Sequence, residues 1–382
     1  MLNFRKLNFK LDSLVPSGAQ KQEYNLIDRY NSTKILALSF LFKLIVVVAH
    51  SSNLVLNLGK ESTKISGTFN SFLQNFIENG ISRMAVPTLF LISGYLFFST
   101  IKTGSKQEFI DKFKKRFKTL VLPYLFWSLF GILLFFVLQS LPASKPFFTK
   151  GLIRDFSIVQ WLHTIFVLPI AAQLWFIRDL IVIIVFTPII YQLLKIVPKL
   201  SLVTCFILWF FSVRLYLFSP ESLFFFTVGS YWAVSKIALK DFYKIKYSLL
   251  WLIVWIALTA MKTLLLEQHI YVKWLIILLQ KTSVITGIIA VWYGYDLLYK
   301  NDDISKKRYY TLFKYSFWIY VTHQPILNII KKGLYYFMGM SNWSSLTIYI
   351  LGPVITLFII LSVGIIMRKY VPKLYFISTG GR

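Results

Sequence analysis

The sequence predicts an all-α fold, a polytopic membrane bundle of about ten transmembrane helices with both termini in the cytoplasm. Hydrophobic residues make up 57% of the chain, more than an ordinary soluble domain contains. Apolar runs of about 20 residues, the length that crosses a bilayer, recur from residue 34 to residue 367 with short polar breaks. Lys and Arg residues gather in alternate connections, as in membrane proteins of fixed orientation.

Each expected span is an apolar run bounded by polar or charged residues. We place these spans at residues 34–57, 81–100, 119–140, 173–194, 200–217, 222–239, 246–266, 274–298, 312–333 and 345–367. The chain then consists of an N-terminal tail (1–33), one membrane domain (34–367) and a C-terminal tail (368–382). The first tail has no apolar core followed by a cleavage site, so we expect the first span to direct insertion.

Positive charge sets the expected orientation. The segment 101–118 holds seven Lys or Arg residues, and both tails are also basic. An even number of spans puts the two termini on one side, and cytoplasmic segments carry the excess of Lys and Arg. The formal net charge of +27 fits this rule and the anionic inner leaflet. We therefore expect no nucleic-acid partner.

The first span carries a histidine near its far end, about 22 Å along the helix. Lys43 and Ser39 precede His50 by seven and eleven positions, which puts all three on one helix face. An ionisable residue inside a span marks a pathway or a reactive site facing the bundle interior. The alternative is a histidine that simply lies at the water interface. If His50 is at the outer end, Arg83 enters the second span at the same level, either in one vestibule with His50 or as an interfacial anchor.

A basic run directly before the third span includes Arg116 and Lys118. It either sets topology or holds the phosphates of a coenzyme.

The connection after the third span contains an apolar segment, 158–170, which is too short to span and predicts an interfacial or re-entrant element. In the fourth span Arg178 and Asp179 are adjacent, and adjacent residues do not face each other on a helix, so we expect each to pair elsewhere.

The ninth span brings a further histidine to mid-depth. His323 precedes Gln324 and Pro325, and it is either a hydrogen bonder between packed helices or a member of a site. The lone cysteine, Cys205, excludes a disulfide framework. The four histidines have no partners at the spacing of a zinc site, so we expect no metal.

Five stretches, in chain order, resemble the successive signatures of acyltransferase family 3. They are His50 with Ser51, RMAVPTLFLISGYLFF, KKRFKTLVLPYLFW, LWFIRDLI and SFWIYVTHQPIL. The resemblance reaches from the first span to the ninth. It implies a polytopic inner-membrane enzyme that transfers acetyl, sometimes succinyl, from coenzyme A to hydroxyls of exported polysaccharides, peptidoglycan or glycolipids.

The resemblance also assigns catalytic residues. His50 matches the family's essential histidine at the end of the first span. It is expected to act as a base on the acceptor hydroxyl or as an acyl relay, since imidazole titrates close to working pH. Arg83 and His323 match polar positions of their stretches, and Arg83 is expected to stabilise the developing oxyanion.

On the donor side, Arg116 matches the first arginine of the family's cytoplasmic basic motif. Lys118 stands where a second arginine is usual. The family often has arginine eleven positions before the histidine, but this chain has Ser39 there. Lys43, one turn further on and on the same face, is expected to substitute and to neutralise charge along the path of acyl-CoA, most simply acetyl-CoA.

The sequence thus predicts a membrane O-acyltransferase of a bacterial plasma membrane. Its expected partners are the lipid bilayer, a surface polysaccharide or lipid-linked sugar as acceptor, and proteins of polysaccharide synthesis or export. The alternative from another class is a polysaccharide exporter or flippase, because a bundle with buried charges also suits transport. A third is a structural membrane subunit. Transporters often contain two related halves, and no internal repeat is visible here, which favours the enzyme.

Overall fold

The fold is almost wholly helical, as predicted. The residues that the computed structural model describes are 27–58, 61–142, 151–239, 247–300 and 302–381. One feature was not expected: strands β1 (Val55–Leu58) and β2 (Glu61–Lys64) form an antiparallel hairpin in which Val55 pairs with Lys64. The N-terminal tail expected over residues 1–33 lies outside the described residues as far as residue 26.

Six helices in the described ranges are long and apolar enough to cross a membrane. They are α1 (Arg29–Ala49), the continuous helix of α2 and α3 (Phe69–Phe98), the continuous helix of α4 and α5 (Lys106–Ser140), α11 (Ser248–Glu267), α12 (Lys273–Tyr299) and α14 (Asn342–Tyr370). A seventh is obtained if Ala172–Val185 and Thr187–Ile196, which meet at a bend of 61°, form one span. The chain is therefore a multi-pass membrane protein.

Every expected span overlaps at least one helix, but the count of ten is not confirmed. The bounds of the remaining helices are α6 (Ile158–Phe166), α7 (Trp175–Val185), α8 (Thr187–Ile196), α9 (Pro198–Phe210), α10 (Pro220–Val234), α13 (Ser316–Met338) and α15 (Pro372–Thr379). At 13 and 15 residues, α9 and α10 are shorter than the length that spans a bilayer at right angles. Helix α13 is interrupted at Gln324.

Two long helices contain π-helical turns inside them. Phe76–Gly80 joins α2 (Phe69–Asn75), through a short 3₁₀ turn, to α3 (Ala85–Phe98), and Phe117–Val121 joins α4 (Lys106–Arg116) to α5 (Leu122–Ser140). Such single π turns occur often at functional sites because they turn side chains out of the regular register. Both helices begin well before the expected spans.

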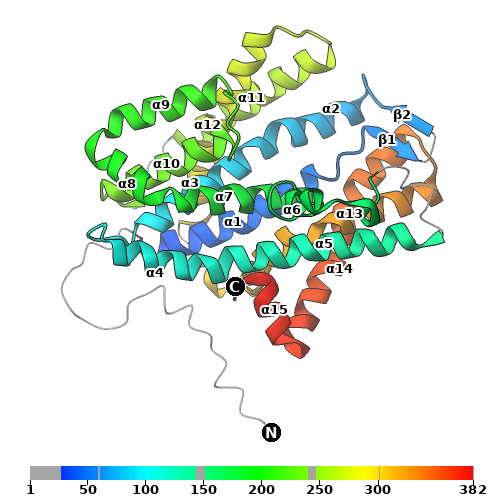
Figure 1. The fold of residues 1–382 in the computed structure, drawn as a ribbon. Helices are drawn as coiled ribbons and strands as arrows, with labels where there is room; N and C mark the ends of the chain where they lie inside the picture. The colour runs from blue at the N-terminus through cyan, green and yellow to red at the C-terminus, as the bar shows by residue number, and fades with distance from the viewer. Residues whose placement is uncertain (1–26, 59–60, 143–150, 240–246, 301, 382) are drawn as a thin grey trace.

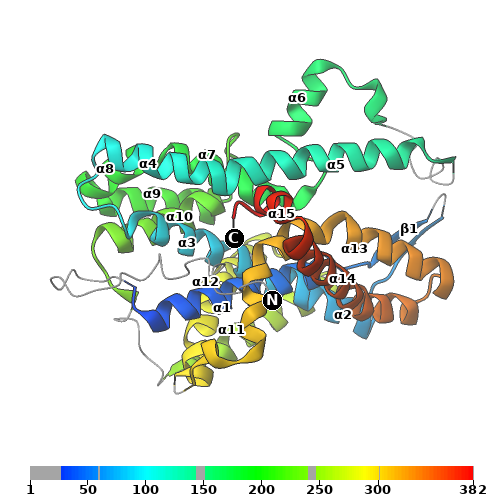
Figure 2. The same ribbon diagram turned by 90° about the horizontal axis from the view of Figure 1, so that it is seen from below.

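Helix α1 runs through the middle of the bundle, where it contacts α3, α13 and α14. Three helix pairs, α3 with α10, α11 with α12, and α13 with α14, pack along one another. The long α4–α5 helix lies on one side, with α11 on the opposite side (Figures 1 and 2). Large apolar side chains such as Leu133, Leu249 and Phe358 are exposed on α5, α11 and α14, as lipid-facing surfaces require.

Short helix α6 stands at the edge of the bundle beside α5 (Figure 2). None of its residues is buried, and Ile158 and Val159 expose 80% and 75% of their surface. Nine residues cannot cross a bilayer, so this element agrees with the interfacial or re-entrant segment expected at 158–170. The C-terminal tail, in contrast, is partly ordered as α15, which packs against α5 and α14.

A buried ion pair joins the first turns of α1 to the end of α12. The Lys34 ammonium donates to both carboxylate oxygens of Asp296, at 2.7 and 2.8 Å, and both side chains are fully buried. Tyr30 donates a third hydrogen bond to the same carboxylate, at 2.7 Å. The Lys34 ammonium also lies 3.9 Å from the ring centroid of Trp292. The charges therefore have the full set of partners that burial in a membrane demands.

The α3–α10 contact depends on two glycines. A Cβ atom at Gly94 would collide with the Phe226 carbonyl oxygen, and one at Gly229 would collide with the Leu91 carbonyl oxygen. Small residues let membrane helices approach this closely, and the close approach supplies the packing that stabilises the pair. Side chains at these positions would push the two backbones apart.

We predict that Gly229→Ala lowers the stability of the detergent-solubilised protein, because the added methyl group overpacks the α3–α10 contact at a cost of about 1–3 kcal/mol. The measurement is the apparent midpoint of thermal unfolding. Gly294→Ala is the control, since a Cβ there meets no atom within 4 Å. A midpoint unchanged by Gly229→Ala would show that the two helices do not depend on their close approach.

Candidate functional site

Two histidines meet where α1 ends and α13 breaks. The ring centroids of His50 and His323 lie 5.4 Å apart, with an angle of 33° between the ring planes. His50 is the residue directly after α1, and His323 lies in the middle of α13. The structure therefore brings together two residues that the sequence places in the first and ninth expected spans.

The backbone beyond His50 is held by buried polar groups. Lys331 donates to the carbonyl oxygens of His50 and Ser52, at 2.9 and 3.1 Å. Ser51 donates to the Tyr349 carbonyl oxygen at 3.0 Å. The two bonds from Lys331 satisfy carbonyls that the end of a helix leaves without partners. The first helix stops at Ala49 rather than continuing to residue 57 as expected.

A second set of bonds fixes the next turn. Asn53 donates through its backbone to the Gln74 side chain at 2.9 Å, and Gln74 donates back to the Asn53 side chain at 2.9 Å. Ser345 donates to the same Asn53 oxygen at 2.6 Å. All three side chains are buried, so this network ties α1, α2 and α14 together next to His50.

The hydrogen bonds of His323 define its tautomer. Its Nδ1 lies 2.7 Å from the Tyr320 carbonyl oxygen and 3.3 Å from that of Ile319. A carbonyl only accepts, so Nδ1 carries the proton and donates it. Nε2 then holds a lone pair in the neutral ring. That atom is buried, and it has no hydrogen-bond partner among the described residues.

The helix break after His323 is braced from the short 3₁₀ turn (Ala172–Leu174) that precedes α7. Gln324 has non-helical backbone angles and Pro325 follows it, so carbonyls in this turn lose their helical partners. The Gln173 amide nitrogen donates to the carbonyl oxygens of Val321 and Gln324, at 3.1 and 3.0 Å. The Tyr320 hydroxyl donates in turn to the Gln173 carbonyl oxygen. Gln173 thereby fixes the turn that carries His323.

Two charged residues, Lys331 and Glu78, act on this part of the site. Lys331 acts electrostatically on His50, and Glu78 acts on Lys331. The buried hydroxyl of Tyr349 has no hydrogen-bond partner among the described residues and is also within range of Glu78. Sequence reasoning missed Lys331 and Gln173 as site residues. Helical spacing could not have found Lys331, because the break at Gln324 lies between it and His323.

Arg83 is not part of the histidine pair. Its guanidinium is exposed and donates to the Asn79 side chain at 2.8 Å. It acts electrostatically on Glu221 and Lys262. Within the described part of the chain, the contacts recorded for Arg83 include neither histidine. Glu78, in the π turn at 76–80, acts electrostatically on Lys331.

The basic run is divided between two faces of its helix. Arg116 and Lys112, four positions apart, lie against the Phe97 ring, at 5.9 and 5.3 Å from its centroid. Arg116 is half-buried, and its Nε has no hydrogen-bond partner among the described residues. Lys118 is exposed, because a residue two positions on points to another face. Lys43 is half-buried on α1.

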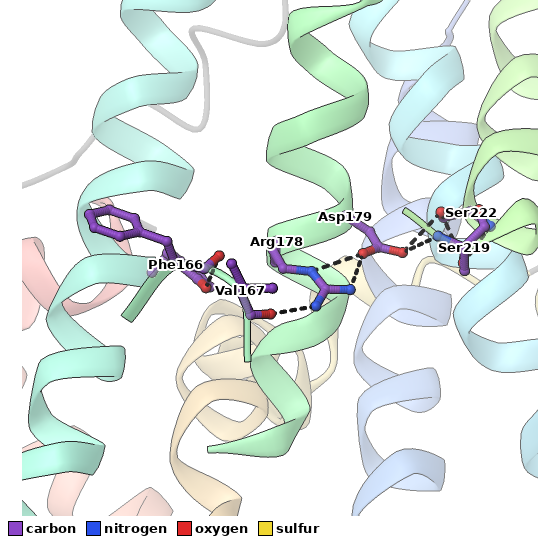
Figure 3. Close-up of polar contacts among 7 residues, drawn as sticks. Phe166, Val167, Arg178, Asp179, Ser219 and Ser222 are labelled. Atoms are coloured by element: carbon purple, nitrogen blue, oxygen red, sulfur yellow. Dashed lines mark hydrogen bonds and ion pairs between the residues drawn. The ribbon is translucent and has the colours of Figure 1, made fainter. Parts of the chain in front are cut away.

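Arg178 and Asp179 correct one expectation, since they pair with each other (Figure 3). The long arginine side chain curls back so that its guanidinium donates to Asp179 at 2.7 Å. The other carboxylate oxygen accepts from the Ser219 backbone at 2.8 Å and from the Ser222 hydroxyl at 3.1 Å. Arg178 also donates to the Val167 carbonyl oxygen at 2.5 Å. The pair therefore ties α7 to the start of α10 and to the segment after α6.

The arrangement suits proton transfer or nucleophilic chemistry at an imidazole. The Nε2 lone pair of His323 is buried and has no partner among the described residues. The half-buried His50 ring lies beside it, and the Lys331 ammonium is close to His50. In the described ranges no group of three or more His, Cys, Asp or Glu side chains is arranged to hold a metal ion. The histidine pair itself offers acid–base chemistry.

The model of the acyltransferase domain of family 3 matches residues 40–367. The chain belongs to this family. It is therefore an acyltransferase that moves groups other than aminoacyl groups. The succinoglycan biosynthesis protein ExoH of Rhizobium meliloti is 24% identical over 315 residues, which cover 81% of this chain and 82% of that protein. No solved structure matches.

We predict that Gln173→Ala destabilises the acyltransferase by about 1–3 kcal/mol, because it leaves the Val321 and Gln324 carbonyls without their donor. The apparent midpoint of thermal unfolding in detergent measures this loss. Gln107→Ala serves as the control, since the Gln107 side chain is exposed. Equal midpoints for the two variants would mean that the break in α13 does not need its brace.

Proposed function

We propose that this acyltransferase moves an acetyl or succinyl group from acyl-CoA to a hydroxyl of an exported cell-surface polysaccharide or glycolipid. The observation that carries the proposal is the His50–His323 pair, with its buried lone pair, inside a chain of this family. The glycan acceptor is supported by the related protein, which is named for succinoglycan biosynthesis. The enzyme would act in the plasma membrane of a bacterium.

The proposed orientation has ten crossings and both termini in the cytoplasm. Its support is the distribution of Lys and Arg, which is densest in the segment 101–118 and in the tails. The ends of α1 and α14 that carry Lys34 and Arg368 would then lie inside. His50 would lie near the outer end of α1, where an exported acceptor is within reach.

In the proposed reaction, the acceptor hydroxyl loses its proton to an imidazole nitrogen of the histidine pair as its oxygen bonds to the thioester carbonyl carbon. The bond from that carbon to sulfur then breaks, and the leaving sulfur takes up a proton. His50 serves either as this base or as a relay that first accepts the acyl group on nitrogen. Lys331, rather than Arg83, would stabilise the oxyanion, because it lies next to His50.

The proposed donor contacts lie at the other end of the bundle. Arg116 is suited to a phosphate because its buried Nε has no partner in the described ranges and a guanidinium binds phosphate in a charge-assisted way. Lys112 adds a second charge beside the same ring, and Lys118 would act from the exposed face. Lys43 would neutralise charge between this end and His50. The coenzyme supplies the activated acyl group.

A polysaccharide exporter or flippase remains the alternative from another class. Buried charges such as Lys34 and Asp296 are common to transporters and membrane enzymes. The two functions differ in one measurable product, since only the enzyme changes the covalent structure of the glycan. Mass spectrometry of surface glycans from cells with and without the gene separates the two functions. Loss of the enzyme removes the acyl group from the glycan, whereas loss of an exporter removes the glycan from the surface.

We predict that His50→Ala lowers acyl transfer at least 100-fold, because no other group replaces a positioned base or relay. The level of the protein in the membrane should stay near normal. Glycan acylation in cells that express the variant is the measurement, and His269→Ala, at an exposed histidine, is the control. Acylation at the parent level in His50→Ala would remove His50 from the mechanism.

A second prediction concerns the cation on α1. Ser39, Lys43 and His50 share one face, so a cation at position 39 would lie about 6 Å further from the histidine along the same path. Lys43→Leu should lower acyl transfer, and adding Ser39→Arg should restore much of it. The measurement is the rate of transfer from acetyl-CoA in isolated membranes. If the double variant is as inactive as Lys43→Leu alone, Lys43 does not serve the donor.

A further inference from the structure

Besides Arg116, a second cluster holds buried polar atoms that have no hydrogen-bond partner among the described residues. Nη1 of Arg368, near the C-terminus of α14, and the hydroxyl of Tyr375 on α15 are both buried and lack a hydrogen-bond partner among the described residues. Tyr375 exposes only 4% of its surface. A buried donor without an acceptor destabilises a fold by about 1–3 kcal/mol, so such atoms usually mark a site that a ligand completes.

The charge at this place is not compensated. The Arg368 guanidinium lies 5.7 Å from the ring centroid of Tyr315 and 5.9 Å from that of Tyr375. The Lys314 ammonium lies 5.6 Å from the same Tyr315 ring and is within electrostatic range of Arg368. Across the described ranges, no ion pair is recorded for either cation. Two like charges are thus held around one aromatic ring with no carboxylate between them.

A purely topological role does not explain this packing. Cytoplasmic cations that only set orientation need to reach water, as the exposed Lys369 does next to Arg368. Arg368 is instead half-buried and lies over two rings, an arrangement that fixes the direction of its guanidinium. The exposed Lys314 leaves the cluster open to ligands from the surface.

Helix α15 links this cluster to the basic helix. Its C-terminal Gly380 packs so closely on the third span that a Cβ there would lie 2.7 Å from the Cα of Thr119. Thr119 is about one turn from Arg116, and Tyr375 is about 8 Å along α15 from Gly380. Helix α15 thus packs against both the helix that continues from Arg116 and α14, which carries Arg368.

We propose that Arg368, Lys314 and Tyr375 form a second phosphate site, which binds the ribose 3′-phosphate of the acyl donor. The inference rests on the proposed use of acyl-CoA, and it assigns the diphosphate of that donor to Arg116. A phosphate monoester carries close to two negative charges at neutral pH, which matches two cations, and its oxygens accept from the guanidinium and the tyrosine hydroxyl.

The test compares coenzyme A with 3′-dephospho-coenzyme A as ligands of the purified full-length protein in detergent. The parent protein should bind coenzyme A at least tenfold more tightly, the effect of one charge-assisted contact. Arg368→Gln and Lys314→Gln should bring the ratio of the two Kd values close to one while leaving the Kd for the dephospho form unchanged. Lys369→Gln, at the exposed neighbour, should keep the parent ratio.

Lys314→Gln keeps the test decisive if Arg368→Gln does not fold, because Lys314 is exposed. A parent protein that binds the two coenzymes equally, or a ratio that survives both substitutions, overturns the second phosphate site while the proposed function stands. If neither coenzyme binds, the acyl-CoA donor is overturned together with this site.

The phosphate of a membrane lipid is the other source of the same chemistry. The binding comparison is therefore repeated with added phosphatidylglycerol and, separately, with phosphatidylcholine. The midpoint of thermal unfolding is measured in the same samples. If Arg368→Gln abolishes the stabilisation by phosphatidylglycerol but keeps the ratio of the two coenzyme Kd values, the cluster binds a lipid headgroup and our assignment is wrong. Loss of the coenzyme ratio in both lipids supports the assignment.

Discussion

The need to satisfy backbone polar groups inside a bilayer governs the centre of this molecule. A helix that breaks within a membrane frees carbonyls that water cannot reach, and each must find a donor in the protein. Here the break follows His323, and the Gln173 amide supplies two hydrogen bonds to it. The end of α1 has the same need, which Lys331 meets at His50 and Ser52. The two interruptions bring the two histidine rings together.

Much of this fold follows from hydrophobic patterning, and the parts that do not follow have physical reasons. Each apolar run of the sequence overlaps a helix of the structure, because a segment that crosses a bilayer must be long and hydrophobic. The apolar run overestimated the length of the first helix. The residues after His50 are apolar in part, but they form a turn and then strand β1 (Val55–Leu58). Nothing in the local sequence reveals that Asn53, Gln74 and Ser345 meet there.

The candidate site was predictable to a similar degree. His50 and His323 were recognisable because ionisable residues in apolar runs are few, and the structure makes them neighbours. The role of Arg83 stays a prediction, because its contacts among the described residues are with Asn79, Glu221 and Lys262. Spacing alone misjudged Arg178, whose side chain is long enough to reach its own neighbour.

The buried pair of Lys34 and Asp296 has a consequence for how the protein is made. Its members lie 262 positions apart, so the first helix emerges from the ribosome long before its counter-charge exists. Until α12 is synthesised, Lys34 must stay near the water interface, which its flexible side chain allows. Helix α1 therefore settles at its final height late in biogenesis. The level of His50 in the membrane thus depends on a contact at the opposite end of its helix as well as on the bonds around it.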